Sequence, residues 1–170
     1  MNGKTLAILG AFILLVAVVA MISQREAGPE DDSKIGEVLL PGLAEALDSV
    51  NAVAVSSAEG SVSLARQDDV WGVGERAGYP ADFADLSTLT AALSEAKYVE
   101  RKTARAENLP RMGLQDPSAE GSEAVLVELR GNGSSWTVML GGRATGRTGQ
   151  YVRFPPETQV WQIDKFVPVE

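Results

Sequence analysis

One uninterrupted apolar run near the amino terminus constrains this chain more than any other feature of its sequence. The run begins at Leu6, ends at Ile22 and contains no charged side chain. As an α-helix it would be about 26 Å long, because each residue adds about 1.5 Å, and this nearly matches the ~30 Å hydrocarbon core of a bilayer. We therefore expect residues 1–23 to form a single transmembrane signal anchor that meets the lipid bilayer through residues 6–22. A secretory signal that is cleaved after Ala20 is the alternative.

The rest of the chain divides into a tether and a domain. Residues 24–37 are polar and acidic and contain a Gly-Pro pair, a composition that is typical of linkers. Residues 38–170 alternate apolar segments with turn residues and are numerous enough for one domain of ordinary size. Because the tail before the apolar run is very short, we expect the tail to stay in the cytoplasm. This predicts a single-pass protein of the bacterial inner (cytoplasmic) membrane, whose domain at residues 38–170 faces the periplasm or cell exterior.

Composition excludes several classes of function. The formal net charge is −8, and a chain that binds nucleic acid without sequence preference needs a basic face instead. The sequence contains neither Cys nor His, which excludes Ser-His-Asp and Cys-His mechanisms and removes the commonest zinc ligands. We therefore expect a protein that is not an enzyme and that has no cofactor.

Short alternating segments predict antiparallel strands on both sides of one helix. Strands are expected at residues 52–56, 61–66, 71–73, 123–130, 135–140, 150–154 and 159–163. Between the two groups, the period changes to that of an amphipathic helix, with Asp82 as its expected N-cap. Its apolar stripe consists of Phe83, Leu86, Leu89, Leu93 and Ala96. The expected fold class is α+β: an N-terminal transmembrane helix, then antiparallel strands in two groups with this helix packed on a sheet face.

A glycine-rich loop at residues 141–148 is the most tempting candidate site. It resembles a phosphate-binding P-loop, with Arg147 in the place of the usual lysine. A P-loop must open a helix whose amino end faces the phosphates, whereas a strand is expected to follow here. The simpler interpretation is a hairpin loop, and we expect no nucleotide site.

Other residues with functional potential also have simpler interpretations. The three tryptophans lie at alternating strand positions, where large aromatic side chains usually belong to the core. They are Trp71, Trp136 and Trp161. Asp82 and Asp85 are better explained by helix capping than by acid–base chemistry. The loop arginines 143, 147 and 153 are expected to be solvated. We therefore expect no catalytic, cofactor-binding or metal-ligating residue.

Several segments together resemble one bacterial family. They read YPADF at residues 79–83, GLQDP at 113–117, LGGR at 140–143, YVR at 151–153 and VWQI at 160–163. Over about residues 38–164 the chain resembles the family called domain of unknown function 4340. The resemblance implies an N-terminal membrane helix and a mixed α/β body, and some members are encoded beside export-type ABC transporter components. It implies no catalytic residue.

Two function hypotheses follow. The first is a membrane-anchored extracytoplasmic accessory protein that associates with an ABC-type transport assembly. The alternative is an extracytoplasmic ligand-sensing or substrate-binding module. An exposed apolar patch would favour the accessory protein, and a large apolar pocket with converging polar groups would favour the binding module.

Overall fold

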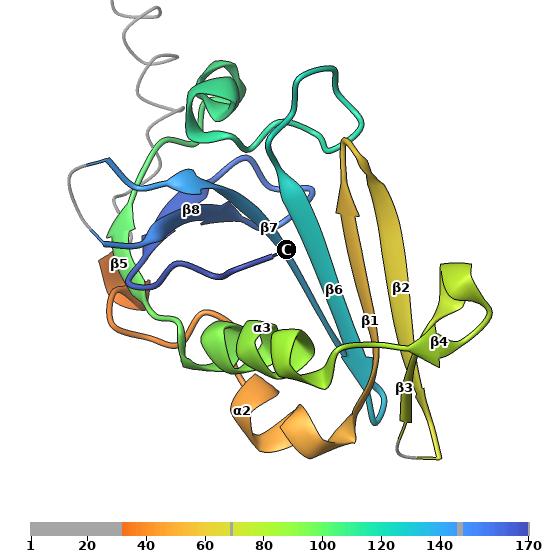
Figure 1. Cartoon of the computed structure of the whole chain (residues 1–170). Helices are drawn as coiled ribbons and strands as arrows, with labels where there is room; N and C mark the ends of the chain where they lie inside the picture. Colours follow the sequence, from red (N-terminus) through yellow and green to blue (C-terminus); the bar gives the residue numbers. More distant parts are fainter. Residues whose placement is uncertain (1–31, 69, 146–147, 170) are drawn as a thin grey trace, which may run out of the picture. The chain divides into compact units, whose positions relative to one another are not determined.

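In the part of the chain that the structure describes, nine strands form a single antiparallel sheet. The computed structural model describes residues 32–68, 70–145 and 148–169, and its sheet has the order β4-β3-β2-β1-β6-β7-β8-β9-β5 (Figure 1). The strands are β1 (Val50–Ser57), β2 (Gly60–Gln67), β3 (Val70–Val73), β4 (Tyr79–Pro80), β5 (Tyr98–Arg101), β6 (Val125–Gly131), β7 (Ser134–Arg143), β8 (Gln150–Arg153) and β9 (Val160–Ile163). The helices are α2 (Leu43–Ala46) and α3 (Phe83–Glu95), with short 3₁₀ helices η1 (Asp32–Lys34), η2 (Leu47–Ser49), η3 (Gly74–Arg76) and η4 (Ala106–Met112).

The fold-class prediction is wrong, because the strands do not form two groups. β1 pairs with β2 on one side and with β6 on the other, so it joins the early strands to the late ones. Ser56 of β1 lies opposite Leu126 of β6, a partner 70 residues further along the chain. Local alternation predicts a strand but says nothing about a partner at that distance. The result is one sheet with few and short helices, rather than an α+β fold.

The transmembrane part of that prediction also finds no support. The helices within the described ranges are all too short or too polar to traverse a lipid bilayer. The predicted anchor at residues 6–22 lies outside the described residues.

Helix α3 covers one face of the sheet, which we call the helix face. Leu86, Leu89 and Leu93 are buried there in one core with side chains from seven strands and from the segment before β1. Fully buried members from that segment and from the strands include Leu39, Leu43, Val53, Val127, Leu129, Val138, Val152 and Ile163. Asp82 caps the helix as predicted, because its Oδ1 accepts a hydrogen bond from the Ala84 amide at 2.8 Å.

The predicted apolar stripe of α3 is wrong at its first residue. Leu86, Leu89, Leu93 and Ala96 are buried, but Phe83 is 65% exposed. Helix α3 begins directly after β4, the strand at the edge of the sheet (Figure 1). The Phe83 side chain lies about a quarter turn around α3 from the side that Leu86, Leu89 and Leu93 share, because each residue turns the helix by about 100°.

The opposite face carries a smaller core beneath η4. Leu109, Leu114, Ala124, Met139 and Val160 form it. Gly113 ends η4 with a left-handed φ of 65°, the conformation expected of a helix-terminating glycine. Gly113 therefore marks the end of η4.

The residues before α2 attach to the edge strand β5. The Gly36 amide donates to the Tyr98 carbonyl at 2.8 Å, and the Tyr98 amide donates to the Glu37 carbonyl at 3.0 Å. The last residues of the predicted linker are therefore hydrogen-bonded to the sheet.

The phenol of Tyr98 should make stability fall at alkaline pH. Burial, reinforced by the carboxylates of Glu157 and Glu37, raises the pKa of Tyr98 to about 12, above the ~10 of an ordinary tyrosine. Because the pKa in the folded state exceeds that in the unfolded state, the stabilisation is complete below about pH 10 and is lost as the pH rises toward about 12. Urea midpoints between pH 9 and 12 should therefore fall less steeply for Tyr98→Phe than for the parent. Identical slopes would contradict this assignment.

Candidate functional site

The glycine-rich loop does not have the context of a P-loop. Gly141, Gly142 and Arg143 are the last residues of β7, and the next element is the strand β8. No helix begins in the described part of this connection, residues 144–145 and 148–149. Gly146 and Arg147 lie outside the described residues. The interpretation as a hairpin connection is therefore confirmed.

Two of the three tryptophans belong to the core, as predicted. Trp71 and Trp161 are 8% and 5% exposed and both belong to the core of the helix face. Trp136 is only partly buried and packs against that core. Its indole N–H donates to the Pro41 carbonyl at 3.0 Å, so it fixes the chain before α2 to β7.

The loop arginines are not brought together. Arg143 lies opposite Gln150 and Arg153 lies opposite Met139, so the two arginines occupy opposite ends of the β7–β8 pair. The prediction of a solvated side chain is wrong for Arg153, which is 8% exposed and donates to the Leu114 carbonyl at 3.0 Å. Burial lowers the pKa of Arg153. This buried cation holds a loop in place and is not available to a ligand.

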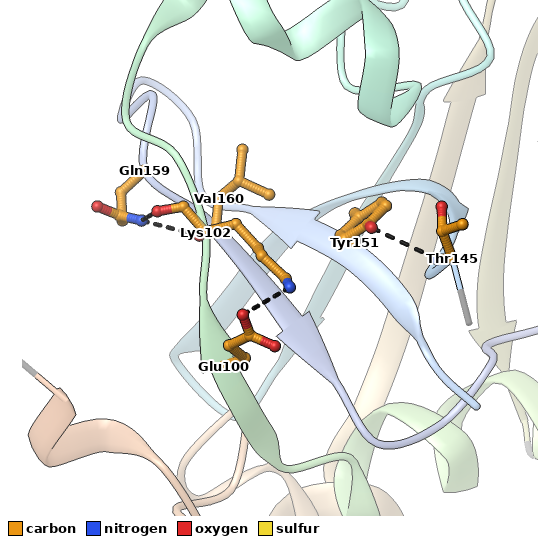
Figure 2. Close-up of polar contacts among 6 residues, drawn as sticks. All are labelled: Glu100, Lys102, Thr145, Tyr151, Gln159 and Val160. Carbon is orange, nitrogen blue, oxygen red and sulfur yellow. Dashed lines mark hydrogen bonds and ion pairs between the residues drawn. The ribbon is translucent and has the colours of Figure 1, made fainter. Parts of the chain in front are cut away.

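Polar side-chain contacts also occur along β5, β8 and β9. Figure 2 shows Lys102 paired with Glu100 at 2.7 Å, and Gln159 Nε2 donating to the carbonyls of Lys102 at 3.2 Å and Val160 at 2.8 Å. In the same view the Thr145 amide donates to the Tyr151 hydroxyl at 3.4 Å. The Gln159–Lys102 contact joins the start of β9 to the end of β5 at the edge of the sheet, whereas the other contacts link residues along one strand or within the β7–β8 connection.

A groove lies where α3 meets the early strands, and we call it the α3 groove. It has a volume of about 250 Å³. Its buried lining comes from three side chains, Val50, Trp71 and Leu86. The remaining lining residues are Leu47, Asp48, Arg66, Phe83, Ser87, Thr90 and Ala91.

A row of apolar side chains, which we call the apolar row, runs across the sheet from the core to the edge strand β4, beside the α3 groove. Cross-strand pairing places Val53 opposite Leu64, Leu64 opposite Val73, and Val73 opposite Tyr79. Opposite residues share one face of a sheet, so the row lies on the helix face. Val53 is 1% exposed and Tyr79 is 66% exposed, with the two residues between them partly buried. The apolar row therefore continues beyond the surface that α3 covers.

The charged residues that line the α3 groove are Asp48 and Arg66. Asp82 and Asp85 lie near Phe83 in the sequence at the start of α3 but do not line the groove. None of these three carboxylates forms an ion pair with another described residue. The one cation in the lining is Arg66, whose Nη2 donates to the Asp48 carbonyl at 2.7 Å.

Sequence reasoning missed both the groove and the apolar row. The apolar row exists because the pairing register of β1 to β4 places its members opposite one another. Strand alternation alone does not reveal that register. One available signal was the position of Phe83 between two acidic residues at the first turn of its helix, since large apolar side chains there are easily left uncovered. Within the described ranges, no group of three or more Asp or Glu side chains is arranged to hold a metal ion.

Comparison with known proteins gives one match. No curated protein and no solved structure matches the chain. Residues 71–167, more than half of the chain, match a family described as Domain of unknown function (DUF4340). The match confirms the family to which the sequence motifs pointed, and it begins at Trp71, after β1 and β2. This chain is therefore a member of the family Domain of unknown function (DUF4340).

Proposed function

We propose that this protein is a non-catalytic accessory protein of the bacterial cytoplasmic membrane, which docks onto another protein outside the cytoplasm. The proposed partner is a component of an ABC-type transport assembly, as the gene neighbours of some family members suggest. The membrane location is supported by the charge-free apolar sequence at residues 6–22. The non-catalytic role is supported by the lack of Cys and His in the sequence.

The observation that carries the docking proposal is the exposed apolar surface around the start of α3. Tyr79 and Phe83 are 66% and 65% exposed and are four residues apart in the sequence. Tyr79 ends the apolar row, and Phe83 lines the α3 groove. Single exposed apolar residues are common, but a connected group beside a groove is typical of protein interaction sites.

The dimensions of the groove favour protein docking over a small ligand. Pockets for drug-sized ligands usually enclose about 300–1,000 Å³, and the α3 groove, at about 250 Å³, is smaller. Two of its polar lining groups already have partners, since Thr90 Oγ1 donates to the Leu86 carbonyl at 2.9 Å and Arg66 to the Asp48 carbonyl at 2.7 Å. The ligand-sensing alternative is therefore less well supported.

Photocrosslinking in living cells tests this proposal. Benzoylphenylalanine in place of Tyr79 should give a crosslinked product of higher mass after illumination. The product should stay in the membrane pellet after an alkaline carbonate wash, and mass spectrometry should identify a transport component in it. The physical reason is that Tyr79 ends an apolar row that a docked partner would cover.

The matched control places the same photoreactive residue at Glu120. That residue is exposed, and it lies outside both the apolar row and the α3 groove. Adducts of equal yield from both positions, or none from Tyr79, would contradict docking at this surface. Recovery of the protein in the carbonate supernatant would contradict the membrane location.

A further inference from the structure

We propose that Asn132, in the turn between β6 and β7, is a site of spontaneous chemical modification, at which its side-chain amide is lost as ammonia. Asn132 and Gly133 form the two-residue turn of this hairpin, because Gly131 lies opposite Ser134 in the register of the two strands. The φ values of the two turn residues are 49° and 80°, both positive, as a type I′ turn requires. Neither residue belongs to the apolar row or lines the α3 groove, so the site is independent of the proposed docking function.

The reaction needs only these two residues and water. The backbone nitrogen of Gly133 attacks the side-chain carbonyl carbon of Asn132. The proton of that nitrogen leaves with the amide group as ammonia, and a cyclic succinimide results. Water then opens the ring at either of its carbonyl carbons. One opening gives aspartate, and the other gives isoaspartate, in which the main chain runs through the former side chain.

The turn leaves the attacking nitrogen accessible. Both turn residues are exposed. Glycine has no Cβ that could hinder its nitrogen, and the surrounding space is open, since a Cβ at Gly133 would meet no heavy atom within 4 Å. Among the described residues, no hydrogen bond holds the Gly133 amide or the Asn132 side chain. The side chain can therefore rotate toward the nitrogen that attacks it.

The other asparagines within the described ranges are better protected. Asn51 precedes Ala52 in β1, and Ala52 is paired with both neighbouring strands, β2 and β6. Asn108 precedes the buried Leu109, and its Nδ2 donates to the Thr103 Oγ1 at 3.2 Å. In both places the following residue has a side chain and the backbone is held by packing or strand pairing. Asn132 should therefore react first.

Isoaspartate in this turn should weaken the hairpin. Its main chain contains one additional carbon, so the connection is longer than the two-residue loop that sets the register of the strands. That register aligns seven residue pairs, from Gly131 opposite Ser134 to Val125 opposite Leu140. The new carboxylate also changes the formal net charge from −8 to −9, because it replaces a neutral amide.

Peptide mapping of the aged protein tests the proposal. The full chain is kept in mild detergent and mildly alkaline buffer, and every sample carries Asn2→Gln, because Asn2 also precedes a glycine and lies outside the described residues. Mass spectrometry should find aspartate and isoaspartate at position 132, while Asn51 and Asn108 keep their amides. The modified fraction, which anion exchange separates by its additional negative charge, should have a lower urea midpoint than the unmodified chain.

Matched variants separate the turn from the other exposed asparagine. Asn132→Gln keeps an amide but places it one methylene further from the main chain, where ring closure is slower, so most of the acidic fraction should be lost. Asn51→Gln makes the same change in β1 and should leave the yield unchanged. The urea-unfolded chain is the positive control for the chemistry.

Three results would contradict the proposal. The first is an Asn132 amide that persists in the folded chain while the unfolded chain reacts at that position. The second is a rate at Asn51 or Asn108 that equals the rate at Asn132. The third is a modified chain with the urea midpoint of the unmodified one, which would refute the expected weakening of the hairpin.

Discussion

Replacement of Gly149 by alanine should lower the free energy of unfolding by about 2–6 kcal/mol, because the change combines backbone strain with a steric clash. Gly149 has a φ of +122°, which side chains with a Cβ rarely adopt, and a Cβ there would lie 1.9 Å from the Ile163 carbonyl oxygen. That oxygen belongs to β9, so the clash would separate β9 from the start of β8. Such a loss is a large part of the ~5–15 kcal/mol that stabilises a typical domain. Urea denaturation followed by tryptophan fluorescence measures it.

Gly133→Ala is the matched control for this prediction. Gly133 also has a positive φ, +80°, but a Cβ there would meet no heavy atom within 4 Å. The control therefore bears only the strain of the backbone, about 1–3 kcal/mol. Gly149→Ala should be the more destabilising change by at least about 1 kcal/mol. Equal losses would mean that the chain accommodates the clash without cost.

Leu93→Ala should cost about 2–5 kcal/mol, the usual penalty for a cavity in a core. Leu93 is 0% exposed and lies in the core of the helix face. The substitution removes buried methyl groups at the turn of α3 that packs on the sheet. The urea midpoint should therefore fall strongly while the m-value stays near that of the parent.

Phe83→Ala provides the comparison on the same helix. Both residues belong to the stripe that the sequence pattern predicts, but Phe83 is 65% exposed. Its removal should change the free energy of unfolding by no more than about 0.5 kcal/mol. A loss for Phe83→Ala that matches the loss for Leu93→Ala would mean that the first turn of α3 is also core.

Local features of the fold could be predicted from the sequence because they depend on neighbouring residues. The alternation of Val125, Val127 and Leu129 specifies both a strand and its buried side, and Val127 and Leu129 are fully buried in β6. The Asp82 cap and the αL glycine at 113 likewise follow from chemistry within one turn of helix.

The arrangement of the strands and the candidate site could not be predicted in the same way. The pairing of β1 with β6 depends on contacts between residues far apart in the sequence. The α3 groove depends on the side chains that η2, β1, β2 and β3 place beside α3. Periodicity assigns Phe83 to the same stripe as Leu86, and only the packing of the folded chain distinguishes their environments.

The central position of β1 also affects how this protein is made. During synthesis β1 and β2 leave the ribosome well before β6, because they precede it in the sequence. Ser56 of β1 therefore has no strand partner on this side until Leu126 of β6 has been made. The early hairpin therefore spends that interval with one long side of β1 unpaired, and contacts between distant residues form slowly in folding. Exposed strand edges promote association with other chains. The hairpin of β1 and β2 is thus open to association with other chains until β6 has been made.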